Sequence, residues 1–331
     1  MSDKKLISVL QATSKQSIGV IRSLLKSGKY SVRALSLRGS ESSEAKILLK
    51  EFNNSKDLEF VKGDAKNTDD LKKVFKGAYG AFIISPNIDL EEVNFEEEEW
   101  KYSKIQGDLA AEAGIKHLIF SGMDKFDKSR EELRKEFPHL FFVNRDQVRE
   151  YYESLPIQYV STVALGYFYT NFIEYYRPQV LEDGTFVFGL PETPSDFPLP
   201  YVDCLSAPGP MVVEIFDHPD QNQHKIIPLT TEYLSGNQIA QQFTEITGIP
   251  AVYQSIPKDF FLQIFGDKKL TALKVIAMYE HSTKNSYYSK DNKDIYLSNS
   301  KNPNQPTWKQ FLSKYQWKGQ EYAEIKNQLV Q

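Results

Sequence analysis

Residues 6–29, LISVLQATSKQSIGVIRSLLKSGK, carry the pattern of a strand, a tight turn and a helix. The stretch begins with an apolar run that is too short for a helix and suits a strand buried on both faces. That run is Leu6, Ile7, Val9 and Leu10. After the turn, apolar side chains recur on one helical face, and Gly28 can end the helix because glycine tolerates a positive φ. The stretch therefore predicts the first half of a βαβ unit.

The turn from Gln11 to Ser17 places a helix N-terminus at the carboxyl end of the strand. Its free N–H groups and partial positive charge stabilise an anionic phosphate there, so the expected ligand is a dinucleotide. The usual fingerprint carries three glycines, but Gln11, Ser14 and Ser17 occupy those positions here. Serine can hydrogen-bond a phosphate, whereas Gln11 must direct its side chain near the ligand or open the turn. The alternative is a crossover that binds nothing.

Strands and helices alternate along the first half of the chain. The sequence predicts strands at 6–10, 31–37, 58–62, 79–85, 117–121 and 157–165. It predicts helices at 18–26, 41–52, 67–75, 91–113 and 148–152, the third with Thr68 as its N-cap, and a polar stretch through Pro138 after the fifth strand. This order predicts an α/β fold, a Rossmann-like doubly wound parallel sheet with right-handed crossovers.

Beyond Leu165 the pattern changes, because prolines interrupt short elements and strands no longer alternate with helices. We therefore expect a Rossmann-like dinucleotide-binding domain at 1–165 and a smaller C-terminal α+β lobe at 166–331, with some segments packed back on the first domain. Helices are expected at 239–247, after a capping box, and at 259–265, 269–279 and 307–315, the last as the final helix. A long loop is expected at 285–306.

Loops that follow parallel strands line the ligand crevice of such a sheet. Four residues are placed near Ser14 in this way: Asp64, Ala65, Ser85 and Pro86. Arg38 ends the second strand, where an acid favours the 2′-hydroxyl of NAD and an arginine the 2′-phosphate of NADP. The sequence thus favours NADP, with NAD as the alternative. An ordinary solvated charge is the other interpretation of Arg38.

Composition excludes several classes of function. The 331 residues carry a net charge of −4 and a pI near 5.9, which argues against direct nucleic-acid contact, since phosphate binding needs clustered Lys and Arg. Cys204 is the single cysteine, so a reducing compartment fits. The N-terminal residues lack the apolar core expected of a signal peptide, no apolar run reaches membrane length, and the histidines lack metal-ligand spacing. We expect a soluble protein of the cytoplasm, with the nucleus as a further location, that binds neither metal nor membrane.

The chain resembles the NmrA-like family, atypical members of the short-chain dehydrogenase/reductase superfamily. The resemblance rests on QATSKQ (11–16), VRAL (32–35), LEFVKGDAKNTDDLKKVFKGAYGAFII (58–84), AAEAGIKHLIFSGM (110–123), DGTFVFGLPE (183–192), PLPYVD (198–203) and EYLSGNQIAQQFTEITGIPAVYQSIP (232–257). It implies a Rossmann-like domain that holds NAD(P) and a smaller lobe that closes over it. The residues expected to hold the cofactor are Ala12, Thr13, Ser14, Lys15, Gln16, Arg38, Asp64, Ala65, Ser85, Pro86 and Arg145.

Members of this family are of two kinds. Some are reductases of quinones or phenolic compounds, whereas others, including fungal regulators of nitrogen metabolism, bind the nucleotide without turnover and act through protein partners. Typical reductases of the superfamily use a tyrosine and a lysine four residues apart, and Phe141 and Arg145 align with these positions. Phe141 has no hydroxyl and a guanidinium stays protonated, so neither transfers a proton, although Arg145 can still bind ribose or phosphate. Nearby candidates for a substitute donor are Lys135, Tyr151, Tyr152, Tyr167 and Tyr169.

Three hypotheses follow. The first is an NADP(H)-binding regulator or redox sensor without dehydrogenase activity, which acts through a protein partner of unknown identity. The second is an NAD(P)H-dependent reductase of quinone or enone-type small molecules with a displaced acid. The third is a scaffold that no longer binds nucleotide, as the degenerate glycine turn suggests.

Overall fold

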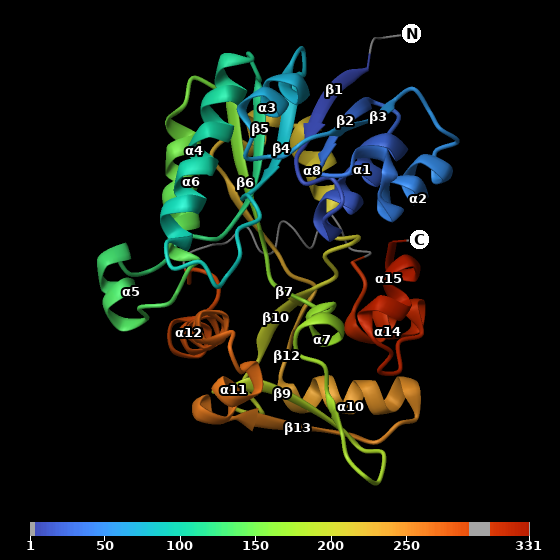
Figure 1. Cartoon of the computed structure of the whole chain (residues 1–331), viewed down its shortest axis with the longest axis vertical. Helices are drawn as coiled ribbons and strands as arrows, with labels where there is room; N and C mark the ends of the chain where they lie inside the picture. The colour runs from blue at the N-terminus through green and yellow to red at the C-terminus, as the bar shows by residue number, and fades with distance from the viewer. Residues whose placement is uncertain (1–3, 291–304, 331) are drawn as a thin grey trace.

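The computed structural model describes residues 4–290 and 305–330. Its largest layer is a seven-stranded sheet in the order β11-β6-β5-β4-β1-β2-β3, with every neighbouring pair parallel. The strands are β1 (Lys5–Val9), β2 (Tyr30–Ser36), β3 (Leu58–Lys62), β4 (Gly80–Ile84), β5 (His117–Gly122), β6 (Tyr159–Leu165) and β11 (Ile226–Leu229). The sheet fills the upper half of Figure 1 and confirms the predicted Rossmann-like α/β fold.

Helices cover both faces of this sheet. One face packs against α3 (Thr68–Phe75), α4 (Phe95–Glu112) and α6 (Val143–Ser154). The other packs against α1 (Lys15–Lys26), α2 (Ser43–Glu51) and α8 (Pro208–Asp217). Because both faces are covered, the central strand β4 carries only apolar residues and glycine, and all of β5 is buried.

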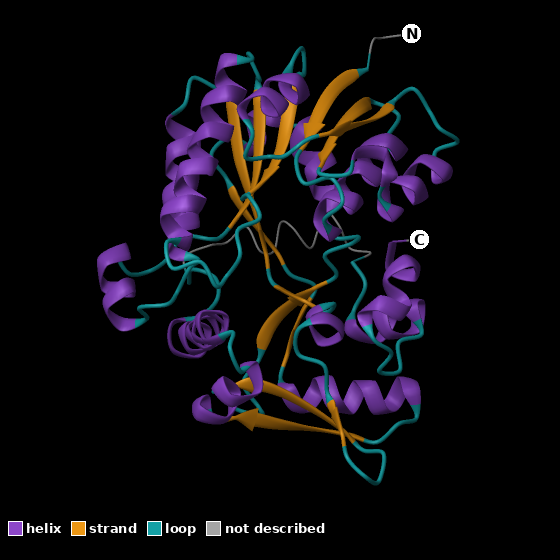
Figure 2. Cartoon of the chain, in the orientation of Figure 1, coloured by secondary structure: helices purple, strands orange, loops and turns teal. Residues whose placement is uncertain are grey.

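The second half of the chain adds two three-stranded sheets and returns one strand, β11, to the edge of the first sheet beside β6. The two small sheets have the orders β12-β10-β7 and β13-β9-β8, and Figure 2 shows their short strands among helices in the lower half. Their strands are β7 (Tyr167–Phe168), β8 (Gln179–Val180), β9 (Phe186–Pro191), β10 (Leu199–Val202), β12 (Glu232–Leu234) and β13 (Ala251–Ile256). The division at residue 165 stays a prediction.

The remaining helices are α5 (Arg130–Glu136), α7 (Asn171–Glu174), α9 (Pro219–Asn222), α10 (Gly236–Thr247), α11 (Lys258–Phe265), α12 (Lys269–Asn285), α14 (Trp308–Tyr315) and α15 (Tyr322–Val330), with a short 3-10 turn, η1, at Gly39–Glu41. Most of them lie around these small sheets, whereas α5 contacts α6 and α9 contacts α8 and β6. Of the loop predicted at 285–306, residues 291–304 lie outside the described residues. Helix α15 follows α14, so the prediction that the helix at 307–315 is the last was wrong.

Two other local predictions were wrong for identifiable reasons, and one stretch for which no element was predicted contains a helix. Helix α4 begins at Phe95 rather than at residue 91, because the Glu91 carboxylate accepts a hydrogen bond from the Thr271 amide at 2.7 Å and its segment is held against α12. Asn67, not Thr68, caps α3, since its side-chain oxygen accepts from two amides of the first turn. The polar stretch through Pro138 contains α5, whose N-terminus is closed by a capping box at Ser129.

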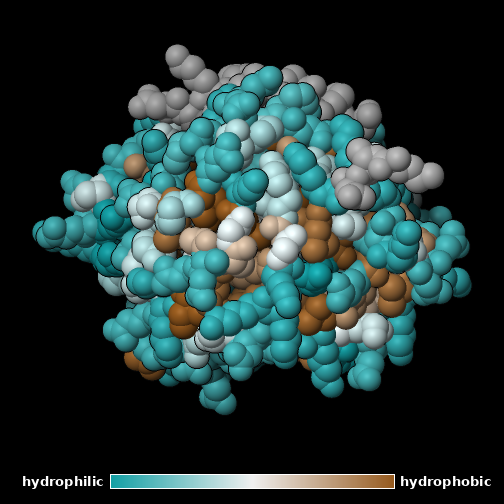
Figure 3. Space-filling model, turned by 90° about the horizontal axis from the view of Figure 1, so that it is seen from above, coloured by the Kyte–Doolittle hydropathy of each residue, from teal (hydrophilic) through white to brown (hydrophobic). Residues whose placement is uncertain are grey.

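Three features of the described residues concern membrane spans, metal sites and the surface. Every helix in the described ranges is too short or too polar to cross a bilayer. Within those same ranges no three His, Cys, Asp or Glu side chains gather as a metal site requires. Seen from above, the molecule is mainly hydrophilic, with hydrophobic residues gathered near the centre of that face (Figure 3).

Two glycines set how closely α1 lies against α8. A Cβ added to Gly19 would lie 2.3 Å from the carbonyl oxygen of Leu205, and one added to Gly209 would lie 2.3 Å from the carbonyl oxygen of Gly19. Neither neighbour is a flexible side chain, so any larger residue must push backbone apart. This contact fixes α1, and therefore its N-terminus, relative to the second half of the chain.

Gly19→Ala is expected to lower the free energy of unfolding by about 1–3 kcal/mol, the usual effect of overpacking. Lys26→Ala on the same helix is the matched control, because the Lys26 side chain is 62% exposed. It should change stability by less than about 0.5 kcal/mol. Urea denaturation measures both variants, and equal stabilities would show that α1 and α8 do not meet through backbone.

Candidate functional site

Two hollows meet at the carboxyl ends of the central strands. The first, which we call the polar hollow, measures about 510 Å³ and is lined by Arg38, Asp64 and Ala65 among others. The second, the aromatic hollow, measures about 480 Å³ and lies between the large sheet and the second half of the chain. Thr13 and Ser14 line both. The turn before α1 therefore stands where the two hollows join, as expected for a ligand that spans them.

The first turn of α1 presents unpaired donors at this junction. The Ser14 side chain caps the helix by accepting from the Ser17 amide at 3.3 Å, and the Ser14 carbonyl accepts from the Ile18 amide at 3.0 Å. Among the described residues, the amides of Lys15 and Gln16 have no acceptor. Two N–H groups and the positive end of the helix dipole are thus available to an anion.

Gln11 stands at the position of the missing first glycine and adopts a backbone conformation typical of glycine. Its φ of +47° lies in the left-handed region that glycine usually occupies. Its side-chain amide donates to the Ser85 carbonyl and lies 3.5 Å from the Ile84 carbonyl oxygen. The turn keeps the glycine-like backbone conformation, and the side chain ties the end of β1 to the end of β4 rather than pointing into open space.

Eight of the eleven residues expected to hold a cofactor line one or both hollows. They are Thr13, Ser14, Lys15, Gln16, Arg38, Asp64, Ala65 and Arg145. The other three do not: Ala12 is fully buried with its amide donating to the Leu35 carbonyl at 2.8 Å, and Ser85 and Pro86 are buried behind the Gln11 tie. Ser17 is also turned away, because its hydroxyl donates to the Leu10 carbonyl at 2.9 Å.

The loop after β3 is held in place on the floor of the polar hollow. One carboxylate oxygen of Asp64 accepts from the Lys66 amide at 2.9 Å. The Ala65 carbonyl accepts from the buried side-chain amide of Gln106 at 3.0 Å. Arg38 stands across the hollow on an exposed side chain, 66% accessible, with its guanidinium 3.9 Å from Glu44. The polar hollow therefore has a wall held by hydrogen bonds and a lining that includes two cations, Arg38 and Lys66.

Arg145 and Phe141, which align with the lysine and tyrosine of typical reductases, both line the aromatic hollow. The Arg145 Nε donates to Glu99 at 3.2 Å, and its guanidinium lies 5.2 Å from the ring centre of Phe142. Glu99 is 1% exposed, so this ion pair holds Arg145 firmly. Phe141 packs edge-on against Phe95 at 5.6 Å. Ser14 and Arg145 line the same hollow, as expected.

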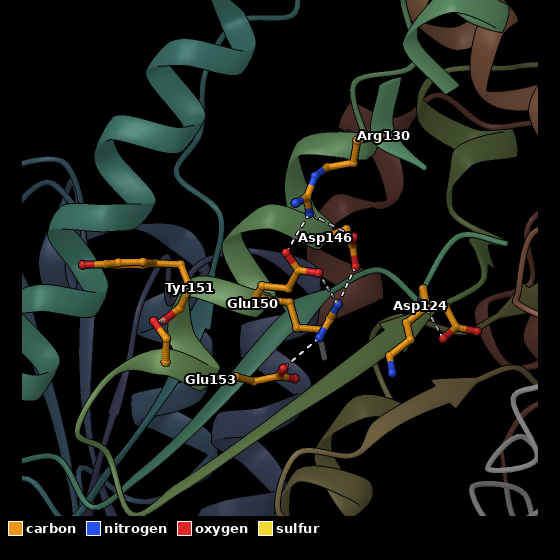
Figure 4. A network of polar contacts seen from close by, with 9 residues as sticks. Asp124, Arg130, Asp146, Glu150, Tyr151 and Glu153 are labelled. Carbon is orange, nitrogen blue, oxygen red and sulfur yellow. Dashed lines mark hydrogen bonds and ion pairs between the residues drawn. The ribbon is translucent and has the colours of Figure 1, made fainter. Parts of the chain in front are cut away.

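A network of ion pairs holds the helix that carries Arg145. Arg130 of α5 contacts Asp146 and Glu150 of α6 at 3.2 and 2.9 Å (Figure 4). The nearly buried Arg149 contacts Asp146 at 2.7 Å and Glu153 at 2.8 Å. Because several charges share partners, the network stabilises α6 more than isolated surface pairs would.

Among the substitute proton donors considered, only Tyr167 lines a hollow. Its hydroxyl lies 2.8 Å from the Ser282 hydroxyl, and burial raises its pKa well above the ordinary value. The other three tyrosines bond elsewhere: Tyr151 to Asp108, Tyr152 to the Ser103 carbonyl and Tyr169 to Glu232. Lys135 lies on α5 and lines neither hollow. A tyrosine with a raised pKa is a poor proton shuttle at neutral pH.

Lys15 joins the start of α1 to the C-terminal elements. Its ammonium forms an ion pair with Glu174 of α7 and lies 4.9 Å from the ring centre of Tyr322 on α15. Burial lowers the pKa of Lys15, but the acidic groups of Cys204 and Glu174 outweigh that effect and raise it above the ordinary value. Lys15 is therefore charged and already paired.

The lining residues of the aromatic hollow that the sequence did not predict include Ser121 and Tyr287. Ser121, near the carboxyl end of β5, approaches the Gln16 side chain at 2.5 Å, and its position at a strand end could have identified it. Tyr287, which follows α12, donates to the Leu165 carbonyl at 2.7 Å. No local signal pointed to Tyr287, because 122 residues separate it from Leu165.

Comparison with known proteins agrees with this geometry. The sequence model of the NmrA-like family matches residues 3–316. The nitrogen metabolite repression protein nmrA of Emericella nidulans is 30% identical over 266 residues, covering 77% of this chain and 69% of that protein. The NmrA-like family domain-containing oxidoreductase lnaB of Aspergillus flavus is 23% identical over 308 residues, covering 88% of each. The crystal structure of NmrA, a negative transcriptional regulator, in complex with NAD is 23% identical, with a TM-score of 0.73 over 93% of this chain and 94% of that one.

The tie made by Gln11 can be separated from its backbone conformation. Gln11→Ala and Gln11→Gly both lose the hydrogen bonds to β4, but only glycine removes the strain of a positive φ. We expect Gln11→Gly to be more stable than Gln11→Ala by about 1 kcal/mol, the order of the left-handed penalty. Thermal unfolding of both variants measures this, and an alanine variant at least as stable would contradict the left-handed turn.

Proposed function

The chain belongs to the NmrA-like family, and we propose that it is an NAD(P)-binding regulatory protein that lacks dehydrogenase activity and acts through a protein partner. The observation that carries the proposal is the pairing of an open phosphate-type site at α1 with Phe141 and Arg145 in the positions of a proton donor and its helper. NADP is the preferred cofactor in this proposal because Arg38 lines the polar hollow, and NAD is the alternative.

The residues present fit a dinucleotide. The free amides of Lys15 and Gln16 would hold the diphosphate, and the polar hollow beside Arg38, Asp64 and Ala65 would receive the adenosine half. The aromatic hollow beside Arg145 would receive the nicotinamide half. Hollows of about 510 and 480 Å³ are each of a size that holds part of such a ligand.

The same residues disfavour reduction of a carbonyl. A bound NADPH supplies a hydride, but the product must also receive a proton from the protein or from water. Phe141 has no ionisable group, and Arg145 is committed to Glu99 and keeps its proton. We therefore propose that the nucleotide acts as a signal: its bound form stabilises one arrangement of the residues around the hollows, and a partner in the cytoplasm or nucleus responds to that arrangement.

A second candidate function is an NAD(P)H-dependent reductase of quinone or enone-type molecules. Tyr167 and Ser121 favour it, because both line the aromatic hollow and carry hydroxyls. Quinones need less help from a protein acid than simple ketones, since their reduced form holds charge on a delocalised ring. The name of the relative lnaB, an oxidoreductase, is consistent with this alternative. A scaffold without nucleotide is the third candidate, and the Gln11 tie to Ser85 favours it.

A negative charge introduced at the α1 cap tests the dinucleotide site. Ser14→Asp keeps a good N-cap, so α1 should remain folded. Its carboxylate would face the bound phosphate, and we expect NADP binding to weaken at least about 100-fold because like charges in contact disfavour binding by several kcal/mol. Ser14→Asn, a neutral cap of the same size, is the matched control and should bind within a few-fold of wild type.

Calorimetric titration with NADP and NADPH measures all three proteins, with thermal melts to confirm folding. Equal NADP affinity in Ser14→Asp and Ser14→Asn would show that the phosphate does not bind at the start of α1. Absence of saturable binding to the wild-type protein would overturn the proposal and favour the scaffold.

An assay of NADPH oxidation distinguishes the regulator hypothesis from the reductase hypothesis. Wild-type protein mixed with NADPH and a panel of quinones and enones should oxidise no NADPH above the protein-free rate, since burial raises the pKa of Tyr167, the one substitute donor considered that lines the hollow. Absorbance at the NADPH band follows the reaction. Activity that is lost in Tyr167→Phe but kept in Tyr169→Phe would favour the reductase over the regulator. Tyr169 is the control because its hydroxyl bonds Glu232 and it does not line the hollow.

A further inference from the structure

Glu44, in the first turn of α2, is a buried carboxylate shared by two cations from distant parts of the chain. Its side chain is 7% exposed. One oxygen contacts the Lys326 ammonium of α15 at 2.5 Å. The other accepts from the Ser43 hydroxyl at 3.1 Å and lies 3.9 Å from the Arg38 guanidinium. Glu44 therefore connects the C-terminal helix to the cation at the rim of the polar hollow.

The two cations are not held equally. Lys326 makes a short contact and is 33% exposed, whereas Arg38 is 66% exposed and at the outer limit of an ion pair. Burial alone raises the pKa of Glu44, but the hydrogen bond from Lys326 outweighs it, together with bonds from its own backbone and Ser43, and the pKa lies below the ordinary value. Glu44 is therefore ionised at neutral pH, and Lys326 is its principal counter-ion.

Removal of Lys326 would leave a buried carboxylate with Arg38 as the remaining cation recorded beside it among the described residues. An unpaired buried charge is strongly unfavourable, so the guanidinium would be drawn from 3.9 Å into direct contact. A guanidinium engaged in that way has fewer donors to offer to a second anion, because its N–H groups lie in a fixed fork.

We propose that Lys326 is a positioning residue for nucleotide specificity: by neutralising Glu44 it leaves Arg38 free to bind the 2′-phosphate of NADP. This inference rests on the proposed function, since it requires that the polar hollow holds the adenosine half of a dinucleotide. It assigns the C-terminal helix α15 a role in distinguishing NADP from NAD, although Lys326 itself does not line the hollow.

The experiment compares NADP and NAD affinity by calorimetry for wild type, Lys326→Ala and the double variant Lys326→Ala/Glu44→Gln. Lys326→Ala should weaken NADP binding about tenfold, the scale of one charge-assisted hydrogen bond. NAD binding should change less than about twofold, because NAD has no 2′-phosphate for Arg38 to bind. The double variant should recover the wild-type NADP-to-NAD ratio, since a neutral amide in place of the Glu44 carboxylate no longer attracts Arg38.

Lys309→Ala is the matched control. Lys309 pairs with Glu245 at 2.6 Å on α10 and is 46% exposed, so this variant removes the same charge elsewhere. It should leave the ratio unchanged. Thermal melts verify that each variant is folded, and Lys326→Gln serves as a second, less truncated replacement.

Each outcome has a distinct meaning. An unchanged ratio in Lys326→Ala overturns the inference while leaving dinucleotide binding intact. A loss that the double variant does not restore also overturns it, because Lys326 would then act directly through its own charge. If wild type binds neither nucleotide, the proposed function fails and the inference fails with it.

Discussion

The start of α1 beyond the carboxyl end of β1 is the constraint on which the rest depends. Ser14 caps the helix and leaves the amides of Lys15 and Gln16 open at the junction of two hollows. That placement is maintained from two sides: Gln11 ties the turn to β4, and close backbone contact with α8 holds the helix itself. Without it the crevice would lose the two helix N-terminal amides that a diphosphate would bind.

The second half of the chain supplies many of the side chains that surround the start of α1. It supplies β11 to the large sheet, Glu174 and Tyr322 to Lys15, and most of the aromatic lining. Every tyrosine that we considered as a proton donor is hydrogen-bonded, and burial raises the pKa of Tyr167 well above its ordinary value. The aromatic hollow can therefore hold a flat ring, and the one substitute donor considered that lines it, Tyr167, has a raised pKa.

Local sequence patterns predicted the sheet and the first βαβ unit, because burial on both faces and helical spacing are properties of short segments. Ser14 was placed by its position after the first strand and Arg145 by the family resemblance, and both line the aromatic hollow. Local patterns could not place Tyr287 or Lys326, which reach the site through contacts across more than a hundred residues. The late start of α4 also depends on a contact between residues far apart in the sequence. The Thr271 amide donates a hydrogen bond to the Glu91 carboxylate, and this tertiary contact holds residue 91 outside the helix that the local pattern predicts.

A crystal structure of the protein grown with NADPH tests the central claim most directly. The account predicts the diphosphate against the amides of Lys15 and Gln16, with Phe141 and Arg145 on the nicotinamide side and neither a tyrosine hydroxyl nor a lysine ammonium in contact with the ring. A cleft that remains closed to the nucleotide, or a tyrosine and lysine brought against the nicotinamide, would contradict it.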